Sequence, residues 1–259
     1  MLIATWNVNS LKVRLPQVLS WLAQWQPSIL GVQELKQTND AVDVAALRAS
    51  GYEVLINGQK TYNGVALIYD PALGAPTNII TDIPGFEDPQ RRVIAATFGT
   101  LRVINLYVVN GESTTSDKFI YKQRWLDALT RWIEVEQSQH PNLVLMGDFN
   151  IAPTDADVHD PAAFKGQVLC TDIERNHFAQ WLTMGMIDTL RYFEPENACY
   201  TWWDYRAAGF RRDRGLRIDH ILVSEALRPR LLHAEVDREA RGWERPSDHA
   251  PVRLLFGAD

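Results

Sequence analysis

The stretch Leu143-Val144-Leu145-Met146-Gly147-Asp148-Phe149-Asn150 decides how the rest of the chain is interpreted. Its first four residues are apolar without interruption, which is typical of a short strand buried in a core. Gly147 permits a close approach of the backbone, and Asp148 and Asn150 follow two residues apart. Residues at that spacing share one face of an extended chain, so we expect a carboxylate and an amide together at the end of a core strand. The alternative is an ordinary turn, because Asp and Asn are common turn residues.

The composition indicates an ordinary globular protein. The chain has 259 residues, of which 46% are apolar and 22% are charged, and its formal net charge is -6. This charge argues against a protein that coats nucleic acid nonspecifically, although a local basic surface remains compatible with it. Cys170 and Cys199 do not form a CxxC pair, so we expect neither a zinc cluster nor a disulfide framework. Without a leader pattern or an apolar run of membrane-spanning length, we expect a reduced, cytoplasmic protein that does not associate with membranes.

The spacing of apolar residues predicts a mixture of strands and helices. Strands are expected over residues 2–6, 29–32, 52–56, 64–69, 92–98, 101–109, 143–146, 218–223, 231–236 and 251–256. Helices are expected over 13–25, 41–50, 116–139 and 173–184, with irregular chain over 153–172 and a loop over 197–217. Gly99-Thr100 marks a hairpin, and the strict alternation of a wholly parallel sheet is missing. We therefore expect one α/β domain over residues 1–259, with two sheets packed face to face and helices outside.

Several of the expected core strands end in side chains that carry oxygen or nitrogen. These side chains are Asn7, Glu34, Tyr107, Asp148 with Asn150, and Asp248 with His249. A hard divalent cation such as Mg²⁺ binds through one or two carboxylates and keeps waters for a phosphate substrate, which makes Glu34 and Asp148 the first candidate ligands. Each acid taken singly is better explained as a solvated loop residue, so the prediction depends on the joint pattern. The sequence contains no P-loop, GxGxxG or HExxH motif.

Ser247-Asp248-His249 precedes the last expected strand and has two interpretations. A serine hydrolase is disfavoured because the sequence has no GxSxG elbow. His249 could instead contact or protonate a phosphoryl group if a carboxylate holds it, and Asp219 is the partner we expect. His220, by contrast, is interpreted as a packed or surface histidine.

Residues 200–217 combine five arginines with five aromatic residues. Arginine suits phosphates through its forked donors, and aromatic faces stack on unpaired nucleotides. In an acidic protein this segment is where we expect DNA contacts, and the alternative is a solvated loop with a few core tryptophans. The expected DNA contacts are Arg206, Arg211, Arg212, Arg214 and Lys60, and other basic residues could extend them, namely Lys36, Arg91, Arg92 and Lys122.

Eight short motifs occur in a fixed order along nearly the whole chain. They are TWNVN (5–9), VQELK (32–36), YNGVA (62–66), NLYVVN (105–110), GDFNIAP (147–153), YTWWDYR (200–206), GLRIDHIL (215–222) and PSDHAPV (246–252). Together they resemble the exonuclease III family of apurinic/apyrimidinic (AP) endonucleases, within the endonuclease/exonuclease/phosphatase superfamily. The loops over 111–118 and 153–172 are less basic than the family's familiar members would suggest.

The resemblance implies a fold, a reaction and a cofactor. The fold is a four-layer α/β sandwich with two mixed, mostly antiparallel sheets. The reaction is metal-dependent hydrolysis of DNA, either 5′ to abasic sites or at 3′-blocking groups, including 3′-phosphate removal and 3′→5′ exonuclease activity. Mg²⁺ is the implied ion, with Mn²⁺ as an alternative. We expect a monomer that acts on double-stranded DNA with abasic sites, nicks or blocked 3′ ends.

The resemblance also implies roles for individual residues. The metal positions match Asn7, Glu34, Asp148, Asn150, Asp248 and His249, with Glu34 as the main ligand. The catalytic positions match Tyr107, Asp148, Asn150, Asp219 and His249, and whether Asp148 or Tyr107 moves the water's proton stays open. The walls of a pocket for a flipped-out abasic sugar match Trp202, Leu216 and Ile218. Extruding an abasic nucleotide costs little free energy, because no base must be unstacked.

Two other functions remain compatible with the sequence. A phosphatase of the same superfamily would use the same metal and histidine set on a small phosphoester, although it would not need the arginine-rich segment. A non-catalytic DNA-binding module would keep the fold and lose active-site side chains, whereas every matched position here carries a competent one.

Overall fold

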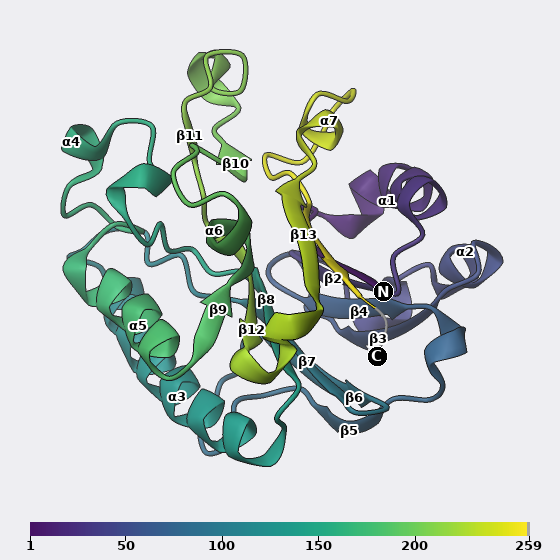
Figure 1. Cartoon of the computed structure of the whole chain (residues 1–259). Helices are drawn as coiled ribbons and strands as arrows, with labels where there is room; N and C mark the ends of the chain where they lie inside the picture. Colours follow the sequence, from purple (N-terminus) through teal and green to yellow (C-terminus); the bar gives the residue numbers. More distant parts are fainter. Residues whose placement is uncertain (258–259) are drawn as a thin grey trace.

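The computed structural model describes residues 1–257 and contains two six-stranded sheets (Figure 1). The first sheet has the strand order β13 (Leu231–Val236), β14 (Val252–Phe256), β1 (Leu2–Asn7), β2 (Ile29–Gln33), β4 (Val65–Tyr69) and β3 (Glu53–Asn57). The second has the order β5 (Thr77–Ile80), β6 (Val93–Phe98), β7 (Leu101–Tyr107), β8 (Leu143–Asp148), β12 (Asp219–Ser224) and β9 (Met186–Asp188). β1 and β2 are parallel, as are β7 and β8, and the other neighbours are antiparallel. Both sheets are therefore mixed and mostly antiparallel, as predicted.

The apolar residues form three layers of packing. One core lies between the two sheets and includes Ile3 and Leu67 from the first sheet and Val103 and Met146 from the second. α1 (Leu11–Trp25) and α2 (Val44–Ala49) cover the outer face of the first sheet. α3 (Asp117–Gln139) and α5 (Asp172–Thr183) cover the outer face of the second, on the opposite side of the molecule (Figure 1). The predicted four-layer sandwich is confirmed.

Some short strands and helices lie in expected loops or in segments for which the sequence predicted no element. The segment 197–217 contains a two-stranded ribbon of β10 (Trp202–Trp203) and β11 (Gly215–Leu216), and β5, β9 and α6 (Thr189–Phe193) were not predicted. The helix expected over 41–50 is a 3-10 turn (Asn39–Ala41) followed by α2. The remaining elements are α4 (Pro161–Phe164), α7 (Arg238–Arg241) and the 3-10 turns Pro71–Leu73, Asp155–Asp157, Arg206–Ala208 and Glu225–Arg230. Elements this short carry too few residues for a periodicity to be visible.

Among residues 1–257, no helix is both long and apolar enough to cross a bilayer.

The central strand β8 runs two residues further than predicted and includes Asp148. Gly147 makes this possible: its φ is +145°, and a Cβ there would lie 2.0 Å from the carbonyl oxygen of Leu106 on β7. Only glycine permits this close approach between the two parallel strands. Since Met146 points into the core between the sheets, Asp148, two residues later, points to the same face at the edge of that core.

A polar link crosses the core between the sheets just below this edge. Asn105 of β7 donates hydrogen bonds from Nδ2 to the carbonyl oxygens of Val32 and Ala66, at 3.0 and 2.9 Å. Its Oδ1 accepts from Nε2 of Gln33 at 2.6 Å. Asn105 and Gln33 are both fully buried, and each lies within two residues of an expected site residue. The link therefore fixes the two sheets relative to each other at the level of the site.

Candidate active site

Three of the expected site residues form one row across the second sheet. Tyr107 on β7 is paired in register with Asp148 on β8, and Asp148 is paired with Asp219 on β12. Neighbours in such a row direct their side chains to the same face of the sheet. The row faces the first sheet at the end of the core, which brings residues separated by more than a hundred positions together.

The first sheet contributes Asn7 and Glu34. Asn7 ends β1, and its Nδ2 donates to Glu34 Oε1 and to Asp148 Oδ2, both at 2.9 Å. Glu34 follows β2 in a left-handed backbone conformation with a φ of +56°. Its Oε1 also accepts from the Tyr107 hydroxyl at 3.0 Å, and Oε2 pairs with Lys36 at 2.9 Å. Asn7 therefore joins the carboxylates of the two sheets directly.

His249 enters the site from the loop before β14. Its Nδ1 donates to Asp219 Oδ2 at 2.8 Å, and Asp219 also accepts from the Thr201 hydroxyl at 2.6 Å. The Asp219 partner expected from the sequence is thus in contact with the histidine. The hydrogen bond between Asp219 and Nδ1 orients the His249 ring so that Nε2 faces Asp148 Oδ2, 3.8 Å away.

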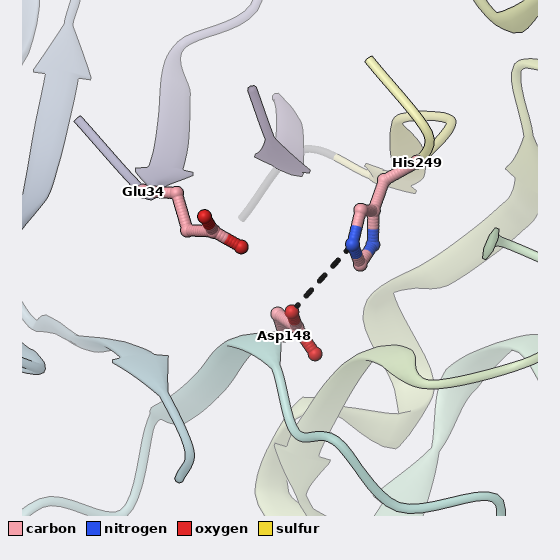
Figure 2. Close-up of side chains that lie close together, drawn as sticks. All are labelled: Glu34, Asp148 and His249. Carbon is pink, nitrogen blue, oxygen red and sulfur yellow. Dashed lines mark ion pairs between the residues drawn. The ribbon is translucent and has the colours of Figure 1, made fainter. Parts of the chain in front are cut away.

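Glu34, just after β2, Asp148, at the end of β8, and His249, in the loop before β14, converge on one space (Figure 2). One ligand atom from each lies within 4.8 Å of the others, a spacing at which they could share one metal ion. Two carboxylates suit a hard divalent cation. Asp248, expected among the ligands, lies outside this group of three and accepts hydrogen bonds from Asn9 at 3.0 Å and from the Trp202 indole at 2.9 Å.

Burial and neighbouring charges set the protonation of the site. Burial raises the pKa of Asp148 to about 7, although the charge of His249 opposes the shift. Burial would lower the pKa of His249, but the carboxylates of Asp219 and Asp148 raise it to about 10. Burial and the charge of Glu34 raise the pKa of Tyr107 well above its usual value. At neutral pH His249 is therefore charged, Tyr107 is a neutral phenol, and Asp148 is the group poised to exchange a proton.

Asn150 reaches the site by a turn, and the extended geometry expected for Asp148 and Asn150 is wrong. Asn150 has a left-handed φ of +47°, and its backbone N–H donates to Asp148 Oδ1 at 2.9 Å. Its side-chain Nδ2 donates to the Val108 carbonyl oxygen, and its Oδ1 accepts from Asn110. A second N–H on Nδ2 is left to donate to a ligand. Residues 148–150 therefore form a turn and also belong to the site, although the sequence analysis treated these two interpretations as alternatives.

The expected pocket residues lie together but differ in exposure. Trp202, Leu216 and Ile218 belong to one apolar cluster with Val158 and Leu169. Leu216 and Ile218 are 0% and 2% exposed, whereas Trp202 is partly exposed. Of the three, it is therefore Trp202 that offers surface to a ligand.

The basic residues expected to contact DNA fall into three groups. Arg206, Arg211, Arg212 and Arg214 are exposed, and Arg206 pairs with Asp204 at 2.8 Å. Lys60 is exposed on another loop, where it lines a hollow of about 800 Å³ with Lys12 and Lys36. Two of the residues considered for DNA contact are fully buried, which corrects the expectation. These are Arg217, paired with Asp157 at 2.6 Å, and Lys122, paired with Glu174.

The sequence interpretation missed Asn110 and the position of Lys122. Lys122 lies on the buried side of α3 between Phe119 and Leu126, and it contacts the turn of Asn150. A lysine inside the apolar stripe of a helix was the available signal, because such residues are almost never fully buried unless paired. His220 is buried and packed, as expected.

Known proteins are similar to this chain along nearly its whole length. Residues 4–249 match the Endonuclease/Exonuclease/phosphatase family. Exodeoxyribonuclease III of Haemophilus influenzae is 35% identical over 97% of this chain and 98% of its own. A structure titled 3′ phosphatase NExo from Neisseria, bound to product DNA hairpin, is 50% identical with a TM-score of 0.97, and both chains are covered completely. An AP endonuclease from Archaeoglobus fulgidus is 34% identical with a TM-score of 0.95, again over both whole chains.

The family match covers residues 4–249 and so includes Asn7, Glu34, Tyr107, Asp148 and His249. The chain therefore belongs to the endonuclease/exonuclease/phosphatase family, as a nuclease of the exonuclease III type.

Proposed function

We propose that this DNA-repair phosphodiesterase acts mainly on 3′ ends within double-stranded DNA, where it removes a 3′-phosphate or the last nucleotide. The observation that carries the proposal is the convergence of Glu34, Asp148 and His249, with Asp219 behind the histidine. Hydrolysis of a phosphate ester needs a cation site, a base for the attacking water and donors for the phosphate oxygens. This group of side chains can supply all three.

The family depends on a metal ion, and we propose Mg²⁺, with Mn²⁺ as an alternative. Glu34 is the main ligand in this proposal. The other expected ligands around it are Asn7, Asp148, Asn150, Asp248 and His249. Once bound, the ion would neutralise phosphate charge and help the departing oxygen leave.

Asp148 is the proposed base. Its raised pKa of about 7 allows the carboxylate to take a proton from water near neutral pH. Asn7 and the backbone N–H of Asn150 fix its two oxygens, so the direction of attack is set before substrate binds. Tyr107, whose pKa lies well above its usual value, stays protonated and orients Glu34 through its hydroxyl.

His249 and Asn150 are the proposed donors to the phosphate. His249 is charged at neutral pH because of its neighbouring carboxylates, and Asp219 holds its Nδ1 so that Nε2 faces the site. Asn150 has an N–H available beyond its bond to Val108. Donors that are positioned in advance stabilise the charge that develops on phosphorus-bound oxygens without reorganising.

Two observations support 3′ ends over abasic sites as the main substrate. Leu216 and Ile218, expected to wall the sugar pocket, are covered by their own apolar cluster. The relative titled 3′ phosphatase is 50% identical, whereas the AP endonuclease relative is 34% identical. Incision 5′ to an abasic site is the second candidate, favoured by the partly exposed Trp202 beside Asp248.

A phosphatase for small phosphoesters is not favoured, because the relatives matched along their whole length are an exodeoxyribonuclease III, an AP endonuclease and a 3′ phosphatase bound to a DNA hairpin. DNA is the proposed partner, with the exposed Arg211, Arg212 and Arg214 and the partly exposed aromatics beside the site as its contacts. Because every proposed catalytic group comes from one chain, we propose that a monomer suffices.

The test compares two duplexes under one salt and magnesium condition. One carries a 3′-phosphate at a nick and the other an internal abasic site, each with and without EDTA. We expect phosphate release to exceed abasic incision by about tenfold or more, and EDTA to abolish both. Faster abasic incision would reverse the order of the two substrates. Activity that survives EDTA would contradict the metal-dependent site.

Two substitutions test the site itself. Asp148→Asn and His249→Gln should each lower kcat by about a hundred- to a thousandfold, because each removes one group that acts on the transition state. Both replacements preserve size, and Asp148→Asn keeps one of the two hydrogen bonds that the carboxylate accepts from Asn7 and Asn150. The circular dichroism spectrum should therefore be unchanged and the melting temperature should fall only slightly. Retained activity in either variant would remove that residue from the mechanism.

A further inference from the structure

We propose that Lys122 is a positioning residue that sets the conformation of Asn150 from inside the protein. Lys122 lies on α3 and its ammonium group is completely buried. Its Nζ donates to the carbonyl oxygen of Asn150 at 2.7 Å and to that of Asn110 at 3.1 Å. Its third donor goes to Glu174. The proposal rests on the proposed function, because it takes Asn150 to be a donor to the phosphate.

The backbone of Asn150 has a left-handed conformation, with a φ of +47°. This region is uncommon for residues other than glycine, although asparagine tolerates it better than most, so the contacts around Asn150 decide how firmly the turn is fixed. Every backbone and side-chain polar atom of Asn150 has a partner. The N–H bonds to Asp148, the side chain bonds to Val108 and Asn110, and the carbonyl oxygen bonds to Lys122. Lys122 thus supplies the cation that bonds to the carbonyl oxygen of Asn150. It also bonds to the carbonyl oxygen of Asn110, whose side chain donates to the Asn150 side-chain oxygen.

Glu174 completes the arrangement on the other side of the lysine. Its Oε1 accepts from the Leu169 backbone N–H at 3.0 Å, and its Oε2 accepts from the Thr171 N–H and hydroxyl at 3.0 and 2.7 Å. Leu169 has a left-handed φ of +75°, and its carbonyl oxygen accepts from Ala152 N–H at 2.8 Å. The pair therefore joins the turn at Asn150 to the segment that follows it.

Stability alone does not explain a buried ion pair. Removing two charges from water costs about as much as their attraction returns, and apolar replacements of such pairs are often neutral or stabilising. The pair at Lys122 is, however, fully satisfied, with three acceptors for three donors. A fully satisfied polar network specifies one arrangement of its members, which is the property that a site needs.

The test replaces the pair by neutral side chains of similar size, Lys122→Met with Glu174→Gln. The net charge of the protein does not change, so attraction of DNA is preserved. We expect kcat to fall by about 10- to 100-fold, because small displacements of a donor cost this much, while KM and the dissociation constant for DNA stay within about twofold. The same double change in an Asn150→Ala protein should cost almost nothing further, since the group being positioned is already gone.

A matched control lies on the same helix. Arg102 on β7 pairs with Glu136 of α3 at 2.7 Å, and the two side chains are 1% and 5% exposed. Arg102→Met with Glu136→Gln removes a comparable buried pair at the other end of α3. We expect it to lower the melting temperature and leave kcat unchanged. If Lys122→Met with Glu174→Gln does not fold, Lys122→Gln with Glu174→Gln replaces it. The shorter amide side chain also removes the ammonium donor from the carbonyl oxygen of Asn150.

The outcomes separate the two proposals. An unchanged kcat in a folded Lys122 variant would overturn the positioning role, and so would an equal loss in the control. A full additional loss in the Asn150→Ala background would overturn it as well, because the lysine would then act on something else. If Asn150→Ala alone keeps full activity, the role of Asn150 in the proposed function is wrong, and the positioning proposal ends with it.

Discussion

At the scale of residues, two buried histidines differ in charge state: His220 on β12 is neutral, and His249 in the loop before β14 is charged. His249 sits beside Asp219 and Asp148, and its pKa is raised to about 10. His220 is buried against the Arg217 guanidinium, which lies 3.1 Å from its Nδ1, and burial lowers its pKa to about 4. Its Nδ1 accepts from Arg217 and its Nε2–H donates to the Ile151 carbonyl oxygen at 2.9 Å, which requires the neutral ring. Environment, and not residue type, thus separates the proposed catalytic histidine from the structural one.

His220 should make the protein sensitive to acid. The folded protein holds the ring neutral down to about pH 4, whereas the unfolded chain protonates it near the ordinary value of 6.5. Its contribution to stability is therefore complete above pH 6.5 and is lost as the pH falls from 6.5 towards 4. The loss cannot exceed about 1.4 kcal/mol per pH unit for one proton. Urea denaturation at several pH values measures this slope. His220→Gln should flatten it, and an unchanged slope would assign the acid sensitivity to other groups.

At the scale of elements, the sequence predicted the strands and helices that are long enough for their apolar residues to show a period. The hairpin of β6 and β7, the long helix α3 and the strand β13 lie within a few residues of their expected bounds. The ribbon of β10 and β11 could not be predicted, because two-residue strands are defined by their partners and not by a pattern. A similar reason explains why Lys122 and Arg217 were wrongly considered for DNA contact: their buried partners, Glu174, Asp157 and Asp188, are distant in the sequence.

The strand β8 depends on one glycine. A Cβ at position 147 would lie 2.0 Å from the carbonyl oxygen of Leu106, and its φ of +145° is unfavourable for other residues. Gly147→Ala should therefore push β7 and β8 apart and destabilise the protein by about 1–3 kcal/mol or more. Activity should fall as well, because Tyr107 and Asp148 are paired across this gap. Gly85→Ala is a suitable control, since a Cβ there meets no atom within 4 Å and its φ is also positive. Equal melting temperatures for the two variants would contradict this account of β8.

At the scale of the whole molecule, the site exists because two sheets meet. Asn7 and Glu34 belong to the first sheet, and Tyr107, Asp148 and Asp219 to the second. The sequence predicted the polar ends of individual strands, and the family resemblance assembled them into one site. It could not predict the link between Asn105 and Gln33, because two amides inside apolar strands show no partner until the sheets are packed. A single domain over residues 1–259 stays a prediction, and the roles of the site residues stay proposals.

The charge distribution leads to the last prediction, on how an acidic protein holds DNA. With a net charge of -6, attraction must come from local groups, and Arg211 and Arg212 are exposed and form no ion pair among residues 1–257. Each phosphate contact releases counterions, so Arg211→Gln with Arg212→Gln should weaken DNA binding and reduce the slope of log K against log salt by about two. Because neither residue touches the catalytic group, kcat at saturating DNA should not change. Arg124→Gln with Arg131→Gln alters the net charge equally on exposed positions of α3. An equal change of slope in that control would show that overall charge, and not the 206–214 loop, governs DNA binding.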